Sequence, residues 1–111
     1  MKTKPKGGKI MAISDIQKKG SWYAIFNEDG KKIKDFPVSN GDLLGFSSSF
    51  FLLERGSWYS TYDETGKKIK DIPVSSGEFH SIAGDTFVLH RGSWLTTYSS
   101  DGKKIGDRPA R

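Results

Sequence analysis

The chain consists of three copies of one 36-residue unit. The copies are clearest at a Gly-Ser-Trp motif, which stands at residues 20–22, 56–58 and 92–94. A Gly-Lys-Lys-Ile motif, an aspartate and a proline then follow each tryptophan at the same distances. A unit of this length cannot bury its apolar residues alone and packs on its neighbours, so the sequence predicts an array of equal modules.

Composition places the units in the all-β class. Of the 111 residues, 34% are hydrophobic and 13% aromatic, enough for a small packed core, and no stretch shows a helical period. There is no cysteine, which excludes disulfides and thiolate metal sites. We therefore predict a single β-repeat domain over 10–111, with units of about 3–38, 39–74 and 75–111, and a flexible basic arm at 1–9.

Each unit is predicted to hold four short strands. Those of the middle unit span 46–49, 50–55, 58–62 and 68–72, and the other units repeat them 36 residues away. The second strand is apolar on both faces in the last two units, but in the first unit one face carries Asp15, Gln17 and Lys19. Because only a strand covered on both sides needs two apolar faces, we expect the first unit to end the array.

The third strand of each unit alternates strictly. In the first unit one face carries Trp22, Ala24 and Phe26, which places a small residue between two aromatic ones. This pattern is typical of interdigitating sheets, where the small residue leaves room for a neighbour's ring. We predict that this face is the core, with Trp58 at its centre. The predicted core side chains are Trp22, Trp58, Trp94, Phe26, Tyr62 and Tyr98.

Glycines and prolines separate the predicted strands. In the middle unit, Gly56 predicts a tight turn between the second and third strands. Gly66 predicts a type I turn closed by a left-handed glycine between the third and fourth strands. Pro73 is expected to end the fourth strand because it cannot donate to a ladder. The other units carry the same residues 36 positions away.

A four-stranded unit with an aromatic strand and a Gly-Lys hairpin resembles one blade of a β-propeller. The Gly-Ser-Trp motif, followed by Asp-Glu-Thr-Gly-Lys-Lys-Ile at 63–69, is also similar to the short bacterial β-repeat of the WG type. Tyr23, Tyr59 and Leu95 stand where that repeat has a glycine after its tryptophan, and its double-proline tail is absent. We therefore carry over no functional residues from it.

Three blades do not close a ring, since propellers typically have about four to eight. A two-fold homodimer that places the third unit of each chain against the first unit of the other would close a six-bladed ring. The alternative is a monomer with internal three-fold symmetry, a β-trefoil or a β-prism. We expect the dimer because both terminal units keep apolar faces, which would include Trp22, Trp94 and Tyr98.

The formal net charge is +5, and much of it comes from the basic arm and from a Lys-Lys pair in each hairpin. A rim of such pairs could bind phosphates, and Tyr23 and Tyr59 could stack on bases from the face opposite the tryptophans. Acidic residues near the hairpins reduce this field. The candidate binding residues are Lys31, Lys32, Lys67, Lys68, Lys103, Lys104, Arg55 and Arg91.

Asp35, Asp71 and Asp107 recur in every unit. They predict either a ring of carboxylates that could hold a cation, or Asx turns that accept backbone N–H groups where each strand breaks. His80 and His90 occupy non-equivalent positions without cysteine neighbours, so they are expected at the surface. Neither a metal nor a cofactor is predicted.

No phosphate loop, nucleophile elbow or catalytic carboxylate pair is present, so we do not expect an enzyme. The first expectation is a non-catalytic scaffold that binds another macromolecule, in the first place a protein, through its hairpin loops. Two alternatives are polyanion binding, to nucleic acid or an anionic glycan, and sugar binding between blades through exposed aromatics. No apolar run has the length of a membrane helix, and we expect a cytoplasmic protein.

Overall fold

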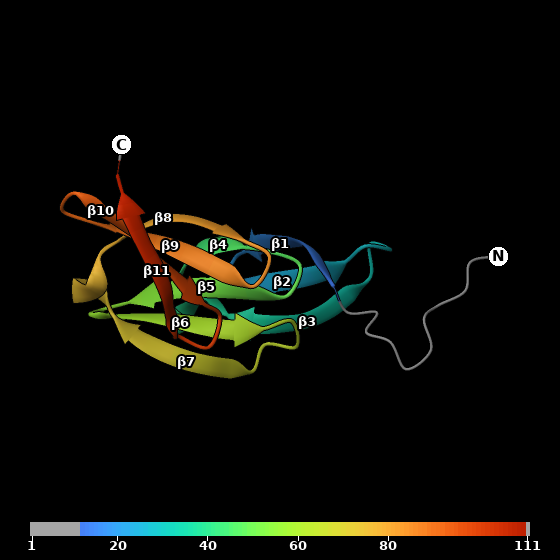
Figure 1. Ribbon diagram of the computed structural model, residues 1–111. Helices are drawn as coiled ribbons and strands as arrows, with labels where there is room; N and C mark the ends of the chain where they lie inside the picture. The colour runs from blue at the N-terminus through green and yellow to red at the C-terminus, as the bar shows by residue number, and fades with distance from the viewer. Residues whose placement is uncertain (1–11, 111) are drawn as a thin grey trace.

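The computed structural model describes residues 12–110 and is all-β, as predicted (Figure 1). The first sheet contains β1 (Ile13–Lys19), β2 (Trp22–Asn27) and β3 (Lys32–Pro37). The middle sheet contains β4 (Asp42–Phe46), β5 (Phe50–Arg55), β6 (Trp58–Asp63) and β7 (Lys68–Pro73). The third sheet contains β8 (Glu78–Ala83), β9 (Thr86–Arg91), β10 (Trp94–Ser99) and β11 (Lys104–Pro109). Two short 3-10 turns, η1 (Val38–Asn40) and η2 (Val74–Ser76), connect the sheets.

Every sheet is an antiparallel meander in which strands adjacent in sequence pair with each other. The second, third and fourth strands of the units lie where the sequence predicts them. The predicted first strand at 46–49 is wrong: β4 ends at Phe46, and Ser47 turns the chain by donating its N–H to the carbonyl of Phe50 at 2.9 Å. The same shift separates the prediction at 82–85 from β8. The predicted arm at 1–9 and most of the predicted strand at 10–13 lie outside the described residues.

The predicted turns are confirmed. Gly66 has φ +85° and donates its N–H to the carbonyl of Asp63 at 2.9 Å, as a type I turn closed by a left-handed glycine requires. Gly56 has φ +62° and begins a two-residue hairpin whose second residue keeps a negative φ, the pattern of a type II′ turn. Pro73 ends β7 as predicted.

The three sheets are stacked face to face, and the middle sheet contributes to a separate core on each side. On β5, Phe51 and Leu53 pack against the first sheet, whereas Phe50 and Leu52 pack against the third. All four side chains are fully buried, and burial of such a side chain stabilises the fold by about 1.5–3 kcal/mol. A strand with two apolar faces is therefore what this position in the stack needs.

The three-fold symmetric alternatives are wrong. The strands of residues 12–110 form three separate sheets and no closed barrel, which a β-trefoil would require. A β-prism would bury one face of each sheet in a single shared core. Here the middle sheet buries both of its faces, so the units follow one another as layers (Figure 1).

The predicted tryptophan core is also wrong. Trp22, Trp58 and Trp94 expose 50%, 49% and 52% of their surface. Each tryptophan is the first residue of its strand and lies opposite the proline that ends the next strand, as Trp58 does with Pro73. Trp58 and Trp94 therefore lie where the adjacent sheet does not fully cover the face, and Trp22 lies on a face with no described sheet beside it. Further along the same strand, Tyr62 is buried as predicted.

The opposite face of the third strands supplies buried side chains instead. Tyr23 and Tyr59 are 4% and 3% exposed, so neither can stack on a nucleic-acid base as suggested. Phe26 is half-buried and belongs to neither core, which contradicts its prediction. Tyr98 packs against the core between the middle and third sheets.

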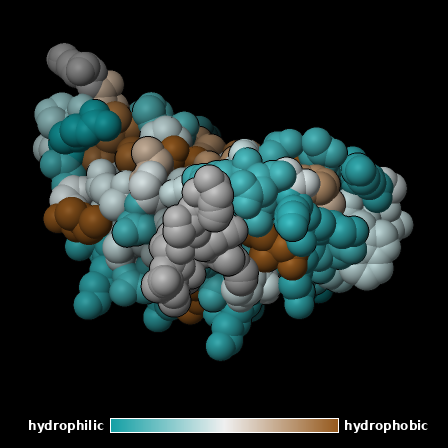
Figure 2. Space-filling view, turned by 90° about the vertical axis from the view of Figure 1, so that its right-hand side faces the viewer, coloured by the Kyte–Doolittle hydropathy of each residue, from teal (hydrophilic) through white to brown (hydrophobic). Residues whose placement is uncertain are grey.

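No sheet of the described residues covers either end of the stack. Tyr98 stacks on Phe87 with ring centroids 5.5 Å apart, so this face of β10, which also carries Trp94, is turned toward the middle sheet. The outer face of the third sheet carries Val88 and Leu95 instead. The dimer contact predicted through Trp94 and Tyr98 is therefore wrong. On the face that Figure 2 shows, hydrophilic side chains predominate and hydrophobic ones lie in separate groups between them. Within residues 12–110 no helix is long and apolar enough to cross a membrane.

Candidate ligand-binding grooves

Each half-exposed tryptophan of the middle and third sheets has an arginine beside it. Trp94 on β10 lies directly opposite Arg91 on β9, and Trp58 on β6 lies opposite Arg55 on β5. Residues directly opposite in antiparallel strands project to the same side, with Cβ atoms about 5 Å apart. A tryptophan and an arginine are therefore paired at the same end of each sheet.

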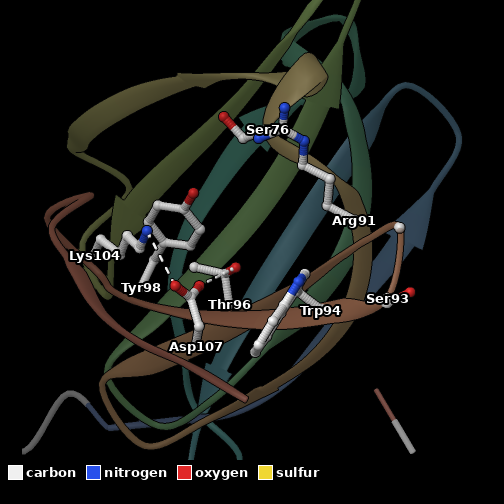
Figure 3. Close-up of a pocket in the computed structure, with 9 residues that line it drawn as sticks. Ser76, Arg91, Ser93, Trp94, Thr96, Tyr98, Lys104 and Asp107 are labelled. Carbon is white, nitrogen blue, oxygen red and sulfur yellow. Dashed lines mark hydrogen bonds and ion pairs between the residues drawn. The ribbon is translucent and has the colours of Figure 1, made fainter. Parts of the chain in front are cut away.

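A carboxylate network lies next to the tryptophan of the third sheet (Figure 3). Thr96 donates its hydroxyl hydrogen to Asp107 at 2.7 Å, and Nζ of Lys104 lies 3.2 Å from the other oxygen of the same carboxylate. Thr96 is two residues beyond Trp94, so it projects to the same face. The network therefore continues the surface that begins at the indole.

The middle sheet repeats this network. Ser60 donates its hydroxyl hydrogen to Asp71 at 2.5 Å, and Nζ of Lys68 lies 3.0 Å from the second carboxylate oxygen. The hydroxyl is carried by serine in one sheet and by threonine in the other, and the position of the donor is the same. Two equivalent sites are therefore present in one chain.

A β-bulge brings the lysine and the aspartate of each network together. Residues three apart on a regular strand face opposite sides, but Lys68 and Asp71 share one side. The register explains this: Thr61 pairs with Lys70 and Tyr62 with Lys68, so Ile69 is an extra residue in β7. Corresponding register shifts occur in β3 and β11.

The networks keep both aspartates ionised. The hydrogen bond from Thr96, and then that from Lys104, hold the pKa of Asp107 below its usual range. For Asp71, the hydrogen bond from Ser60 is the largest cause of a lowered pKa, and the bond from Lys68 adds to it. Each carboxylate is therefore an acceptor at neutral pH.

These side chains line two open cavities, which we call the third-sheet groove and the middle-sheet groove. The third-sheet groove has a volume of about 440 Å³ and the middle-sheet groove about 330 Å³. Ser76 of η2 also lines the third-sheet groove, so the connection between two sheets contributes to it (Figure 3). The side chains lining the third-sheet groove are Ser76, Arg91, Ser93, Trp94, Thr96, Tyr98, Lys104 and Asp107. Those of the middle-sheet groove are Arg55, Ser57, Trp58, Ser60, Lys68 and Asp71.

The first sheet carries an incomplete copy. Lys32 and Asp35 form the ion pair at 3.0 Å, but Ala24 stands opposite the aspartate and supplies no hydroxyl. No described residue forms a sheet over this face. Lys19, which replaces the arginine, lies over the ring of Phe26 at 5.9 Å from its centroid. Trp22 is thus as exposed as its counterparts, but it lines none of the grooves described for residues 12–110.

The arginines of the two grooves are unpaired within the described chain. Neither the Arg55 nor the Arg91 side chain makes a hydrogen bond or ion pair with any residue in 12–110, and both residues are exposed. Lys68 and Lys104, by contrast, are each bound to an aspartate. Each groove therefore has two cations: a lysine that is bound to the single carboxylate, and an arginine whose guanidinium has no described partner.

The structure separates the predicted lysine pairs. Lys68 and Lys104 belong to the grooves, and Lys32 forms the corresponding ion pair on the first sheet. The first lysine of each pair stays exposed in the hairpin turn, where the backbone N–H of Lys67 binds the side chain of Asp63 at 3.0 Å. The lysine pairs therefore do not form one undivided rim. The turn lysines of this kind are Lys31, Lys67 and Lys103.

The recurring aspartates fit neither role proposed for them. Asp71 and Asp107 bind side-chain hydroxyl groups and lysines rather than backbone N–H groups. Among residues 12–110, no three His, Asp or Glu side chains gather as a metal site would require, so the carboxylates form no shared ring. His80 and His90 are exposed, as predicted.

The sequence does contain the signal for the grooves. In the middle and third units, a hydroxyl residue stands two positions after tryptophan, a lysine ten positions after it and an aspartate thirteen positions after it. These offsets identify a groove only when the bulge is known, because the bulge places the lysine and the aspartate on one face.

Comparisons with known proteins place the fold only. No family model matches the chain. No curated protein matches it either. Among solved structures, it is similar to KlHsv2 with loop 6CD replaced by a Gly-Ser linker, a β-propeller, with a TM-score of 0.56 and 14% sequence identity. The likeness covers 82% of this chain and 32% of that one, so this chain spans about a third of its length.

Proposed function

We propose that this protein is a propeller-type, non-catalytic binding module whose two grooves bind carbohydrate. The observation that carries the proposal is the repeated pair of a half-exposed tryptophan and an ionised, hydrogen-bonded aspartate within one groove. An aromatic face beside a fixed set of donors and acceptors suits a ligand with one apolar face and a polar edge. A pyranose ring has both.

The exposed tryptophans support a ligand at this position. An indole combines a broad apolar face with one N–H donor, so it is suited to a surface that is partly dry and partly wet. Trp58 and Trp94 occupy equivalent positions in their sheets, and each exposes about half of its surface. Large apolar side chains exposed beside a cavity are typical of binding sites.

The polar side chains supply the directional contacts. The carboxylate of Asp107 can accept hydrogen bonds from sugar hydroxyl groups, and Lys104 and Arg91 can donate to sugar oxygens. Both groove volumes lie in the range of about 300–1,000 Å³ that small-molecule sites occupy. Each groove is therefore matched to a unit of one or two sugar rings.

Binding without hydrolysis follows from the carboxylates. Glycoside hydrolysis uses two carboxyl groups on opposite sides of the bond, and one of them must carry a proton. Each groove has one aspartate, and hydrogen bonds lower its pKa, which disfavours the protonated form. We therefore propose no catalytic residue.

A titration of the full chain with a panel of methyl glycosides, followed by the indole N–H signals in NMR spectra, tests the proposal. We expect the Trp58 and Trp94 signals to shift on addition of a ligand of this panel. Trp58→Ala with Trp94→Ala should abolish binding. Trp22→Ala is the matched control, because Trp22 is equally exposed but its sheet lacks the hydroxyl group and the arginine of the grooves, and it should bind as the wild type does. Equal loss in the control would contradict the assignment.

A second copy of the chain is the partner we propose for the open ends of the stack. A propeller closes when each sheet has a neighbour on both faces, and three sheets leave the outer faces of the first and third uncovered by described residues. The half-buried Val88 lies on one of these faces, and Trp22 and Phe26 lie on the other. Contact between these faces of two chains would close six blades.

A further inference from the structure

We infer that the sugar selected by these grooves is acidic, and that Arg91 and Arg55 receive its carboxylate. The inference rests on the proposed function and names the ligand class of the same grooves. It follows from three properties of the grooves. The guanidinium has no described partner, the groove has one positive charge in excess, and the arginine is separated from the aspartate that would bind the hydroxyl groups of a sugar.

The guanidinium is the first property. Arg91 has no hydrogen-bond or ion-pair partner among residues 12–110, although Asp107 lines the same groove. Arginine presents a rigid, planar fork of donors that binds a planar carboxylate through two parallel hydrogen bonds. Arg55 has the same position beside Trp58 and is likewise without a described partner. Both grooves therefore contain a guanidinium whose donors no described residue uses.

The charge balance is the second property. The carboxylate of Asp107 is already engaged by Thr96 and Lys104, so its charge is largely compensated within the network. The charge of Arg91 is then the excess in the groove. A ligand that carries one negative charge would neutralise it, whereas a neutral sugar would leave it as it is. Lys68 and Asp71 give the middle-sheet groove the same excess, at Arg55.

The spacing is the third property. Arg91 lies beside Trp94, at the start of β10, and Asp107 lies opposite Thr96, one same-face position further along the strand. Same-face positions on a strand are about 7 Å apart. That separation is comparable with one pyranose ring. The ring can therefore lie on the indole with its carboxylate at Arg91 and its hydroxyl groups at Asp107.

A carboxylate fits better than a phosphate monoester because of its charge. A phosphate monoester carries nearly two negative charges and would draw on a second cation, but Lys104 is held by Asp107 at 3.2 Å. The single planar fork of Arg91 matches the single planar carboxylate of a uronic acid. The ligand class we assign is therefore a uronic acid within a glycan.

The test compares methyl glycosides of glucuronic, galacturonic and mannuronic acid with their neutral counterparts, on the full chain, by NMR titration. At least one acid should bind about tenfold more tightly than its neutral partner, since hydrogen bonds to a charged group are the stronger kind. Arg55→Gln with Arg91→Gln should remove this preference, so that the acid and its neutral partner bind with about equal affinity. Lys67→Gln with Lys103→Gln removes the same charge from exposed turn lysines and should keep the preference.

Other outcomes separate the two proposals. Equal binding of the acid and the neutral sugar, still dependent on Trp58 and Trp94, would overturn the acidic ligand and leave carbohydrate binding in place. Tighter binding of a sugar sulfate than of any uronic acid would also overturn the carboxylate assignment. No shift of the Trp58 and Trp94 signals with any acidic or neutral sugar would overturn both proposals.

Discussion

The hydroxyl group of Tyr59 donates a 2.7 Å hydrogen bond to the carbonyl of Gly77, and this bond joins the middle sheet to the start of the third. Tyr23 makes the equivalent 3.0 Å bond to Gly41 at the preceding junction. Burial, and then the charge of Glu54, raise the pKa of Tyr59, so the hydroxyl remains a donor well above neutral pH. A tyrosine of each of these two sheets thus helps to position the sheet that follows it.

Tyr59→Phe should lower the free energy of unfolding by about 1–3 kcal/mol, because it leaves a partly buried carbonyl without its donor. Urea denaturation measures the change. Tyr98→Phe is the control, since the Tyr98 hydroxyl has no described hydrogen-bond partner while its ring packs on the same core. Equal effects of the two substitutions would show that the hydroxyl of Tyr59 contributes nothing.

Phe51→Ala should destabilise the protein far more than Trp58→Ala. Phe51 is fully buried in the core between the first and middle sheets, and its removal should cost about 3–5 kcal/mol. Trp58 is 49% exposed, so its replacement should cost about 1 kcal/mol. Thermal unfolding of both variants at one protein concentration compares them. A larger loss for Trp58→Ala would place the tryptophan in the core after all.

Acid should weaken the networks of the grooves. The pKa values of Asp71 and Asp107 are lower in the folded protein than their ordinary value near 4, so their stabilising effect is present above about pH 4 and is lost as pH falls through the folded values. The effect should be modest, because both side chains are partly exposed.

Asp71→Asn with Asp107→Asn should therefore lower the Tm at pH 7 and reduce the fall in Tm between pH 7 and pH 3. Asp42→Asn is the control, since Asp42 is exposed and its side chain has no described partner. A pH dependence in the double variant as steep as that of the wild type would contradict the role of these carboxylates.

Ring closure by two chains should make the thermal stability depend on protein concentration. Sedimentation should give twice the chain mass of 12.4 kDa. Val88→Glu introduces a charge on the outer face of the third sheet, where Val88 lies beside Thr97, and should yield monomers. A monomeric wild type whose Tm does not change on dilution would exclude this contact.

The sequence predicts turns and strand order well because they are local properties. Gly56, Gly66 and Pro73 define the ends of strands through backbone geometry that no distant residue alters. The position of β4 was not predictable in the same way. The register shift between Leu43 and Gly45 interrupts the alternation that identifies a strand, so the strand was placed several residues too late.

Alternation alone could not predict how much of each face of β6 is covered by a neighbouring sheet. A period of two separates Trp58 from Tyr59, but both sets of residues include aromatics, and the pattern does not say how far a neighbouring sheet extends. The grooves escaped prediction for a related reason. Strict alternation places Lys68 and Asp71 on opposite faces, and only the extra residue in β7 joins them.

The repetition of one groove on two successive sheets makes the chain bivalent. Both grooves are carried by sheets that share a continuous core, so a polymer that occupies one groove presents its next units to the other at an effective concentration fixed by the protein. Such linkage can raise the overall avidity by about 10²–10⁴ without any new contact. A chain with weak individual grooves would then discriminate between polymers by the spacing of their residues, and would release short fragments quickly.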